Sequence, residues 1–364
     1  MVGYWVSIAM LSLLGAIQIF IPYMLKSTIV FGVTIPTSQI KHATVNQTKK
    51  TYSVAMAIIW LLMIVSYSIW GLSINQNGEL QIVVGVFTML LFILISLLFY
   101  TYFHRKLQVE KQQKQWGADL TEVKIASTNK QDDMLPLSYF WSLALVSVIL
   151  IIYTYYQYPL LPQQVPTHWG PSGEADAFTE KNYFSVISLP LIMLVTQILF
   201  ATISEGTKRS GVKISALNMQ KSAYNQGKKR QYTSKFLFLT AFLITLLFSF
   251  LQLTTIHHAA IGKNFMLAIF IGFIVLTFMG STIFSIKFSK LNKEIAPSNM
   301  SNGLTDLDDD RYWKGGLVYF NKEDPSLFVE KRFGIGWTIN FARPTGYIIL
   351  FGPILIIFFI AYFL

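Results

Sequence analysis

The chain has 364 residues, of which 53% are hydrophobic and 13% are charged, and it contains no cysteine. Soluble domains carry about 25% charged residues, so this composition indicates a membrane protein. Without cysteine the chain forms no disulfide and offers no thiolate to a metal ion or a substrate. We expect the net charge of +11 to lie in loops that face anionic lipids. No compact basic fold accompanies that charge, which argues against direct binding of nucleic acid.

Eight apolar runs of roughly 18 to 24 residues follow one another along the chain. They cover residues 4–24, 53–74, 80–103, 138–157, 183–204, 236–257, 265–286 and 346–364. Each run is long enough, at about 1.5 Å per residue, to cross a hydrocarbon core about 30 Å thick. We therefore expect an all-α polytopic membrane protein with eight transmembrane helices.

The basic residues fall in alternate segments between these runs. Of the 29 Lys and Arg residues, 27 lie in the four segments that follow the first, third, fifth and seventh runs. Cytoplasmic loops retain basic residues, so these four segments are predicted to lie in the cytoplasm. Both termini are then extracytoplasmic, which predicts an N-out/C-out protein of the cell (plasma) membrane.

Charged residues are missing from the interior of the runs. Ion-coupled transporters place ionisable groups near mid-membrane, so a proton- or sodium-driven pump is disfavoured. The polar residues inside the runs are uncharged, among them Gln18, Gln81, Gln197 and Gln252. We expect these glutamines to hydrogen-bond between helices rather than to bind a substrate.

Runs and loops divide the chain into five parts. Residues 1–137 form an N-terminal three-helix membrane region with cytoplasmic loops, and residues 138–204 form a helix–loop–helix unit. Residues 205–287 hold two helices with a basic cytoplasmic loop. Residues 288–345 form a small cytoplasmic β-rich module, and residues 346–364 form the C-terminal transmembrane helix.

The segment 158–182 is the extracytoplasmic loop that is long enough to form a site. Three prolines, Pro159, Pro162 and Pro166, keep its first part extended. The sequence Gly-Pro-Ser-Gly at 170–173 predicts a turn. We expect a compact, ordered loop at the membrane surface, with Trp169 at the level of the lipid headgroups.

The same loop carries a spaced motif, with Pro-Thr-His-Trp at 166–169, Gly-Glu-Ala-Asp at 173–176 and lysine at 181. This pattern resembles the loop motif of SdpI-like bacterial membrane proteins, and the resemblance covers residues 138–204. The best known member of that family is the immunity protein and signal receptor for a secreted killing-factor peptide. The resemblance implies immunity or signal transduction in a Gram-positive bacterium. It also implies a ligand-binding loop formed by Pro166, His168, Trp169, Gly173, Glu174, Asp176 and Lys181.

Taken by themselves, the polar residues of this loop favour a structural role. Glu174 or Asp176 can pair with Lys181, and His168 can bond a backbone carbonyl. Such contacts hold a loop in one shape without any ligand.

Two other interpretations of the loop stay open. Aromatic anchors suit a surface that recognises a peptide or a lipid, and the loop offers Trp169, Phe178 and Tyr183. The third interpretation is a metal site, because two further histidines follow the sixth run. Its ligands would be His168, His257 and His258. We expect no metal and no cofactor.

The segment 288–345 differs in composition from the rest of the chain. It begins with a polar linker and an acidic group at 306–310. The stretches 317–320, 327–329 and 337–341 are predicted strands, separated by a turn at 321–325 and by Gly334 and Gly336. A three-stranded meander of this size is marginal alone, so we expect it to pack against the membrane helices.

This segment resembles a small cytosolic domain of unknown function that follows SdpI-like loops in Firmicute membrane proteins. The residues that match its pattern are Asp310, Tyr312, Trp313, Gly316, Tyr319, Asn321, Asp324, Val329, Lys331, Arg332, Gly334, Gly336, Trp337, Thr338 and Asn340. An upstream phrase at 31–36 is similar to one near the first helix of the same proteins, and we expect it to pack on the meander.

Two roles for the module stay open. It can dock a cytoplasmic regulator, and the residues expected to do so are Asp310, Trp313, Asn321, Asp324, Lys331, Arg332, Trp337 and Asn340. Alternatively, Lys331 and Arg332 bind lipid phosphates or pair with the acidic group, while Trp313 and Trp337 anchor the module at the membrane interface.

Enzyme motifs such as a serine elbow, a phosphate loop or a zinc-protease helix are absent from the sequence. We expect a non-enzymatic membrane sensor or immunity-type protein that couples an extracytoplasmic peptide or envelope-stress signal to a cytoplasmic partner. The alternatives are a transporter or efflux factor for an amphipathic substrate, and an assembly subunit of a membrane complex. A closed helical core favours sensing, whereas a cavity open to one side favours transport.

Overall fold

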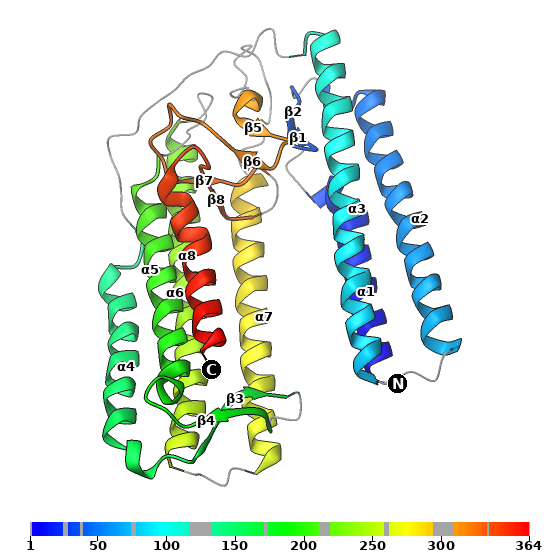
Figure 1. The fold of residues 1–364 in the computed structure, drawn as a ribbon. Coiled ribbons are helices and arrows are strands. Elements are labelled where there is room, and N and C mark those ends of the chain that lie inside the picture. Colours follow the sequence, from blue (N-terminus) through cyan, green and yellow to red (C-terminus); the bar gives the residue numbers. More distant parts are fainter. Residues whose placement is uncertain are drawn as a thin grey trace.

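The computed structural model describes residues 2–24, 28–36, 39–73, 78–116, 133–170, 174–211, 219–257, 262–293, 309–332 and 335–363. Within these ranges eight helices are long and apolar enough to cross a membrane, so the chain is a multi-pass membrane protein. They are α1 (Val2–Met24), α2 (Ala43–Ser73), α3 (Gly78–Gln113), α4 (Leu137–Tyr156), α5 (Ser188–Arg209), α6 (Met219–Ile256), α7 (Lys263–Lys293) and α8 (Pro344–Tyr362). The predicted spans are confirmed in number and order (Figure 1).

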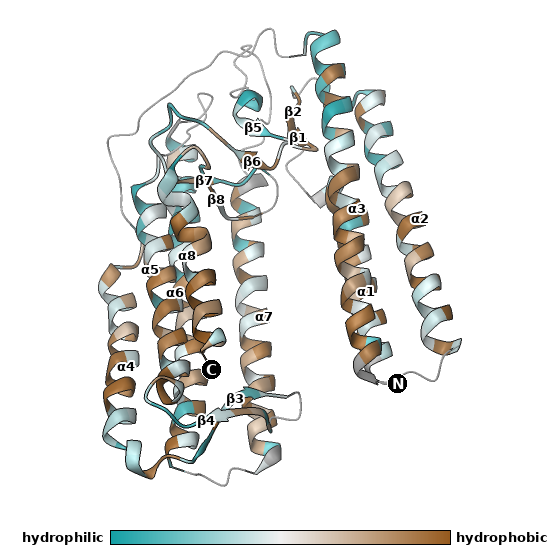
Figure 2. Ribbon diagram, viewed as in Figure 1, coloured by the Kyte–Doolittle hydropathy of each residue, from teal (hydrophilic) through white to brown (hydrophobic). Residues whose placement is uncertain are grey.

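Four helices continue well past their apolar runs, and all four do so toward one end of the molecule (Figure 1). α2 and α6 begin earlier than predicted, at Ala43 and Met219, while α3 and α7 end later, at Gln113 and Lys293. The added turns are rich in Lys and Gln, which favour helix but lower the mean hydropathy. Figure 2 shows this contrast most clearly on α3, whose end is hydrophilic and whose middle is hydrophobic.

α5 begins five residues later than its apolar run because the chain is first turned and capped. The Asn182 side-chain oxygen accepts hydrogen bonds from the backbone N–H groups of Phe184 and Ser185, each at 2.8 Å. A 3-10 turn at Ser185–Ile187 then leads into the helix. An asparagine that bonds backbone two residues ahead favours such a turn over a helix.

The helices form two groups that stand next to each other in Figure 1, an N-terminal bundle (α1–α3) and a C-terminal bundle (α4–α8). The N-terminal bundle has a core that includes Leu11, Met56 and Phe92, each at most 1% exposed. Its helices are also joined by polar contacts. The Trp60 indole donates to the Leu11 carbonyl at 3.2 Å, and the Ser53 hydroxyl donates to the Ile19 carbonyl at 2.7 Å.

Two buried glutamines hold the helices of the C-terminal bundle together. Gln197 on α5 accepts from the Ser147 hydroxyl of α4 at 2.6 Å and donates to the Thr245 hydroxyl of α6 at 2.7 Å. Gln252 on α6 donates to the Val186 carbonyl at 2.9 Å. For these two residues the predicted hydrogen bonding between helices is confirmed.

The described strands pair as four separate antiparallel hairpins of two strands each. They are β1 (Ile29–Val30) with β2 (Val33–Thr34), β3 (Gln164–Trp169) with β4 (Ala175–Glu180), β5 (Trp313–Lys314) with β6 (Val318–Tyr319), and β7 (Phe328–Glu330) with β8 (Trp337–Ile339). The β3–β4 hairpin lies at one end of the C-terminal bundle. The other three lie together at the opposite end (Figure 1).

The predicted three-stranded meander is wrong in its pairing. Its strands are present as β6, β7 and β8, but they pair as parts of two hairpins, and β5 was not predicted. β5 is only two residues long, Trp313 and Lys314, and shows no alternation that a sequence search could find. We refer to the described residues 309–332 and 335–343, which hold β5–β8, as the module.

Replacing Gln197 with leucine should destabilise the C-terminal bundle, because the hydroxyls of Ser147 and Thr245 lose their shared partner. Hydrogen bonds between membrane helices contribute about 0.6–1.7 kcal/mol, and a loss of that size is expected. The measurement is the midpoint of thermal unfolding in detergent. Ser142→Ala is the control, since that exposed hydroxyl bonds only within its own helix. Equal midpoints for Gln197→Leu and the wild type would contradict the prediction.

Candidate functional site

The β3–β4 hairpin occupies the loop that carries the spaced motif. Gln164 pairs with Glu180 and Trp169 pairs with Ala175, with register shifts on either side of His168. Pro166, which is half-buried, lies at the first shift, where its lack of an N–H group interrupts the ladder. The Gly170 N–H donates to the Glu174 carbonyl at 2.9 Å across the end of the hairpin. Gly173 lies outside the described residues.

His168 faces Asp176 across the hairpin. The imidazole Nδ1 lies 2.5 Å from the Asp176 carboxylate, and both side chains are exposed, at 68% and 50%. The expectation that His168 bonds a backbone carbonyl is therefore wrong. An exposed pair contributes little to stability. It does fix the orientation of the ring through Nδ1, and Glu174 of the same hairpin is exposed as well.

Lys181 braces the base of the hairpin. Its ammonium donates to the Leu161 carbonyl at 2.9 Å and lies 4.8 Å from the centre of the Tyr158 ring. Tyr158 in turn stacks on Tyr183, with ring centroids 4.4 Å apart. The expected pairing of Lys181 with a loop carboxylate is therefore wrong, because the chain offers it a carbonyl and an aromatic face instead.

Apolar contacts fix the hairpin to the ends of the helices. Trp169 packs against a cluster that includes Leu247 of α6 and Met266 of α7. At the other side, Val165 packs with Ile256 at the end of α6. The hairpin is thus held on the C-terminal bundle, and Trp169 is half-buried against protein.

The histidines considered for a metal site do not come together in the part of the chain that the structure describes. His257 Nε2 lies 3.0 Å from the Tyr153 hydroxyl. His168 lies against Asp176, and His258 is outside the described residues. Among the described residues, no group of three or more His, Asp or Glu side chains could hold a metal ion.

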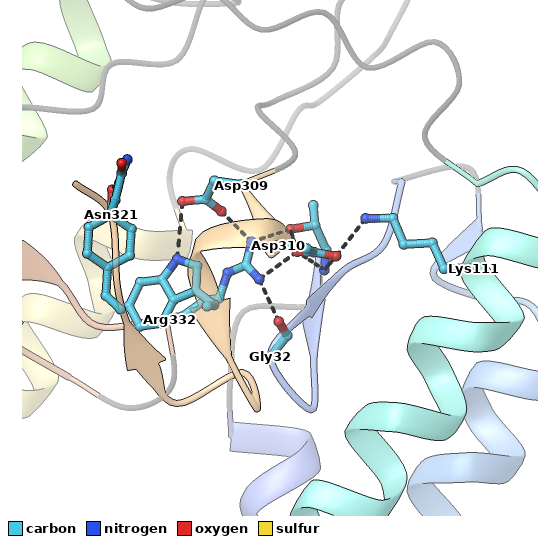
Figure 3. A network of polar contacts seen from close by, with 9 residues as sticks. Gly32, Lys111, Asp309, Asp310, Asn321 and Arg332 are labelled. Atoms are coloured by element: carbon cyan, nitrogen blue, oxygen red, sulfur yellow. Dashed lines mark hydrogen bonds and ion pairs between the residues drawn. The ribbon is translucent and has the colours of Figure 1, made fainter. Parts of the chain in front are cut away.

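At the opposite end of the molecule, the module meets the N-terminal bundle through a buried polar network, which we call the junction (Figure 3). The Asp310 carboxylate accepts from the Thr34 hydroxyl at 2.8 Å and from Lys111 of α3 at 2.7 Å. Arg332 lies 2.5 Å from the same carboxylate. It also donates to the Gly32 carbonyl at 2.5 Å and to the Thr34 hydroxyl at 2.7 Å.

Asp309 extends the junction into the module. It pairs with Arg332 and accepts from the Trp313 indole at 3.2 Å (Figure 3). Trp313 is 4% exposed, so the expectation that it anchors the module in the membrane interface is wrong. The expected pairing of Arg332 with the acidic group and the expected packing of the phrase 31–36 on the module are both confirmed.

Two turns meet tip to tip at the junction. The β1–β2 turn holds Phe31 and Gly32 at φ of 47° and 73°, a combination that suits a tight hairpin. The Phe31 ring is buried against Tyr52 and Phe103, which offsets the strain of its positive φ. A Cβ atom on Gly32 would lie 2.4 Å from the Gly316 Cα atom. Glycine is therefore required where the backbones touch.

The charges around Asp310 decide its ionisation. Burial alone raises the pKa of this carboxyl, but the charges of Arg332 and Lys111 and the hydrogen bonds from Lys111 and Thr34 outweigh burial. The pKa of Asp310 therefore lies below its ordinary value of 3.8. The group is a carboxylate at neutral pH.

Asparagine side chains hold the middle of the module. Asn340, fully buried, accepts from the Asn321 N–H at 3.0 Å and donates to the carbonyls of Asn321 at 2.9 Å and Asp324 at 3.1 Å. Asp324 in turn accepts from the Tyr319 hydroxyl at 2.9 Å. Burial raises the pKa of Tyr319, which keeps this hydroxyl protonated as a donor. These residues close the loop between the two hairpins.

The second hairpin of the module is tied to α6. Glu330 accepts from Lys229 at 2.7 Å and from Gln226 at 2.8 Å. Trp337, half-buried, donates to the Thr233 hydroxyl at 3.3 Å. Of the eight residues expected to meet a cytoplasmic partner, Lys331 is the one with an exposed side chain. The others support the module and its contacts, and direct partner binding stays a prediction.

Sequence reasoning missed several members of these networks. Lys111 stands among other basic residues of α3, and Lys229 stands in a run of three basic residues. Nothing in the sequence separates a lysine that will be buried beside a carboxylate from its solvated neighbours. The sequence could have indicated Thr34, because it belongs to the phrase 31–36, which was expected to pack on the module.

Two segments of the chain match families of proteins. Residues 145–194 match a domain of unknown function (DUF1648), and residues 322–347 match a family of unknown function (DUF5808). The first match spans most of α4, the hairpin and the start of α5. The second runs from the loop after β6 to the start of α8. No curated protein and no solved structure matches the chain. The SdpI-like resemblance stays a prediction.

Replacing Asp310 with asparagine should lower the free energy of unfolding by about 3–5 kcal/mol, because the buried cations Lys111 and Arg332 each lose the charge of one carboxylate. The measurement is thermal unfolding in detergent at pH 7 and pH 5. Because the folded pKa is lowered, the contribution of Asp310 is complete above its ordinary pKa and is lost only as pH falls through the lower folded value. The deficit should therefore be equal at both pH values.

Asp133→Asn is the control for this test, since Asp133 forms a more open ion pair with Lys228 at 3.7 Å. Such a pair contributes about 1 kcal/mol or less. An Asp310→Asn midpoint no lower than that of the control would contradict the buried-pair interpretation.

Proposed function

We propose that this multi-pass membrane protein is a non-enzymatic sensor of the immunity type in the cell membrane of a Gram-positive bacterium. In this proposal the β3–β4 hairpin meets a peptide or an envelope stress outside the cell, and the module passes the signal to a cytoplasmic partner. The observation that carries the proposal is the position of hairpin and module at opposite ends of one helix, α6 (Figure 1).

α6 touches both elements directly. It has 38 residues and is therefore about 57 Å long. Near its beginning, Lys229 holds Glu330 of the module. At its end, Ile256 packs with Leu161 and Val165 at the base of the hairpin. A shift of the hairpin therefore has a direct physical route to the module, along a single helix.

The sidedness in this proposal rests on the distribution of basic residues. The segments that carry 27 of the 29 Lys and Arg residues connect helices at the module end. Figure 1 places the N-terminus at the hairpin end, and ring contact between Phe363 and Phe184 brings the end of α8 near the hairpin. Cytoplasmic exposure of the module and N-out/C-out termini are consistent with this arrangement.

The hairpin has the features of a recognition surface. His168 and Glu174 are exposed and carry hydrogen-bonding groups, while Phe178 and Tyr183 are 53% and 68% exposed. Aromatic side chains beside oriented polar groups are common anchors for peptides.

The interior of the C-terminal bundle favours sensing over transport. Gln197 and Gln252 are the buried polar residues that a path through this bundle would need. Gln197 is hydrogen-bonded to Ser147 and Thr245, and Gln252 is hydrogen-bonded to Thr154 and Val186. Helices joined in this way form a closed core at those positions.

Cysteine labelling tests the sidedness, and the chain has no native cysteine to interfere. Ala177→Cys in the hairpin should react with an impermeant maleimide in intact cells. Lys322→Cys in the module and Gln112→Cys near the end of α3 should react only after permeabilisation. All three positions are exposed. Labelling of Lys322→Cys in intact cells would overturn the proposed orientation.

Survival of cells challenged with a synthetic cationic amphipathic peptide tests the role of the hairpin. His168→Ala and Glu174→Ala should each abolish the protection given by the wild type while leaving protein abundance unchanged, because both side chains are exposed. Glu180→Ala, an exposed glutamate on the same hairpin, is the matched control and should protect. Trp169→Ala is expected to lower abundance, since Trp169 packs on α6 and α7. Full protection by both variants would rule out recognition by this hairpin.

A further inference from the structure

Each of the two helical bundles has its own core. The N-terminal bundle closes around residues such as Leu11 and Phe92, and the C-terminal bundle is tied by Gln197 and Gln252. The β1–β2 turn residue Phe31 belongs to the first core, and Leu317 of the module packs at its edge. Domains within one chain are expected to move relative to each other unless their interface is large and hydrophobic.

The junction joins these bundles through a charged group that has few acceptable positions. Arg332 is 6% exposed and donates to Gly32 of the β1–β2 turn while facing Asp310 (Figure 3). The ion pair that crosses the junction is that of Asp310 with Lys111 of α3, at 2.7 Å. Burial of such a pair is favourable only when its geometry is good, so its main effect is to select one arrangement. The same guanidinium holds both the turn and the module.

Shape reinforces this selection. Atoms of Gly316 lie within 3 Å of the Cβ position of Gly32, and the His104 ring and the Phe31 carbonyl lie equally close to the Cβ position of Gly316. Two turns that fit this closely are either seated or separated, because packed contacts do not deform continuously.

Arg332 is also connected to α6. It follows Glu330 by two residues, and Glu330 is held by Lys229 and Gln226 of α6. A shift of α6 along or about its axis therefore displaces the strand that leads to Arg332. One end of this short segment is fixed to the C-terminal bundle, and the other is fixed to the N-terminal bundle.

We propose that the junction is a releasable latch centred on Arg332. When the contacts of Arg332 with Gly32 and Thr34, and those of Asp310 with Thr34 and Lys111, break together, the N-terminal bundle swings away from the C-terminal bundle while both stay folded. The latch deepens the proposed function, since it supplies the conformational change that a cytoplasmic partner would detect, and its biological meaning rests on that function. The distance measurement below needs no ligand and does not depend on which side of the membrane the module faces. The latch and the proposed sensor function can therefore fail separately.

Because the junction lies at the module end of the N-terminal bundle, a rotation about the junction displaces the opposite end of that bundle most. α3 has 36 residues and is about 54 Å long, so a rotation of about 10° at the junction displaces its far end by about 9 Å. Spin labels on cysteines at Leu72 of α2 and Phe265 of α7 report this distance, and both positions are exposed. A second pair of spin labels, at Leu72 of α2 and Trp5 of α1, reports whether the N-terminal bundle stays intact.

The test is pulsed electron resonance on the full chain in lipid nanodiscs. Arg332→Gln should add a longer-distance population to the Leu72–Phe265 pair and leave the Leu72–Trp5 pair unchanged. Arg343→Gln is the matched control, because Arg343 donates to carbonyls of Asp324 and Lys322 within the module. It should change neither distance.

Gly316→Ala gives a second route to the same result, since it wedges the turns apart and keeps every charge. A longer-distance population in this variant supports the latch even if Arg332→Gln does not accumulate. The proposal is overturned if the distribution of Leu72–Phe265 distances in Arg332→Gln is the same as in the wild type. If only Gly316→Ala accumulates, the same result in that variant overturns it. A change in the Leu72–Trp5 pair would overturn it too, because the bundle itself would then be unfolding.

Discussion

The carboxylate of Asp310 joins three parts of the chain that are distant in sequence. It binds Thr34 from the first loop, Lys111 from the end of α3 and Arg332 from the module. Two cations and the N–H and hydroxyl groups of Thr34 share this single buried anion. The placement of the N-terminal bundle against the module depends on this group more than on any other single contact described.

The membrane explains why a polar contact takes this role. Lipid tails solvate an apolar helix face about as well as another helix does, so apolar surface between the two bundles gives little net drive for association. A buried ion pair outside the hydrocarbon behaves differently, because it loses water on burial and recovers that loss only in one geometry. The junction therefore specifies an arrangement that apolar helix faces alone would leave open.

Hydropathy and basic residues were enough to predict the number and order of the helices, because each span is a local property of about 20 residues. The polar extensions of α2, α3, α6 and α7 were not predicted, because a hydropathy search ends a span where Lys and Gln begin. The pattern of aromatic residues and glycines located β6, β7 and β8 but not their pairing. Strands of two or three residues are paired by tertiary contacts such as that of Asn340 with Asn321, which no local pattern encodes.

Each end of the molecule has a close contact between a basic side chain and a carboxylate, and the two contacts differ in exposure. His168 and Asp176 lie 2.5 Å apart with more than half of one side chain in solvent, so water replaces either partner at small cost. Arg332 and Asp310 are also 2.5 Å apart, but their side chains are 4% and 9% exposed, and neither can lose the other without a large penalty. The proposal that the hairpin meets a ligand rests on this exposure, because an exposed pair loses one partner at small cost. The buried pair instead fixes the side chains through which the module contacts Gly32, Thr34 and Lys111.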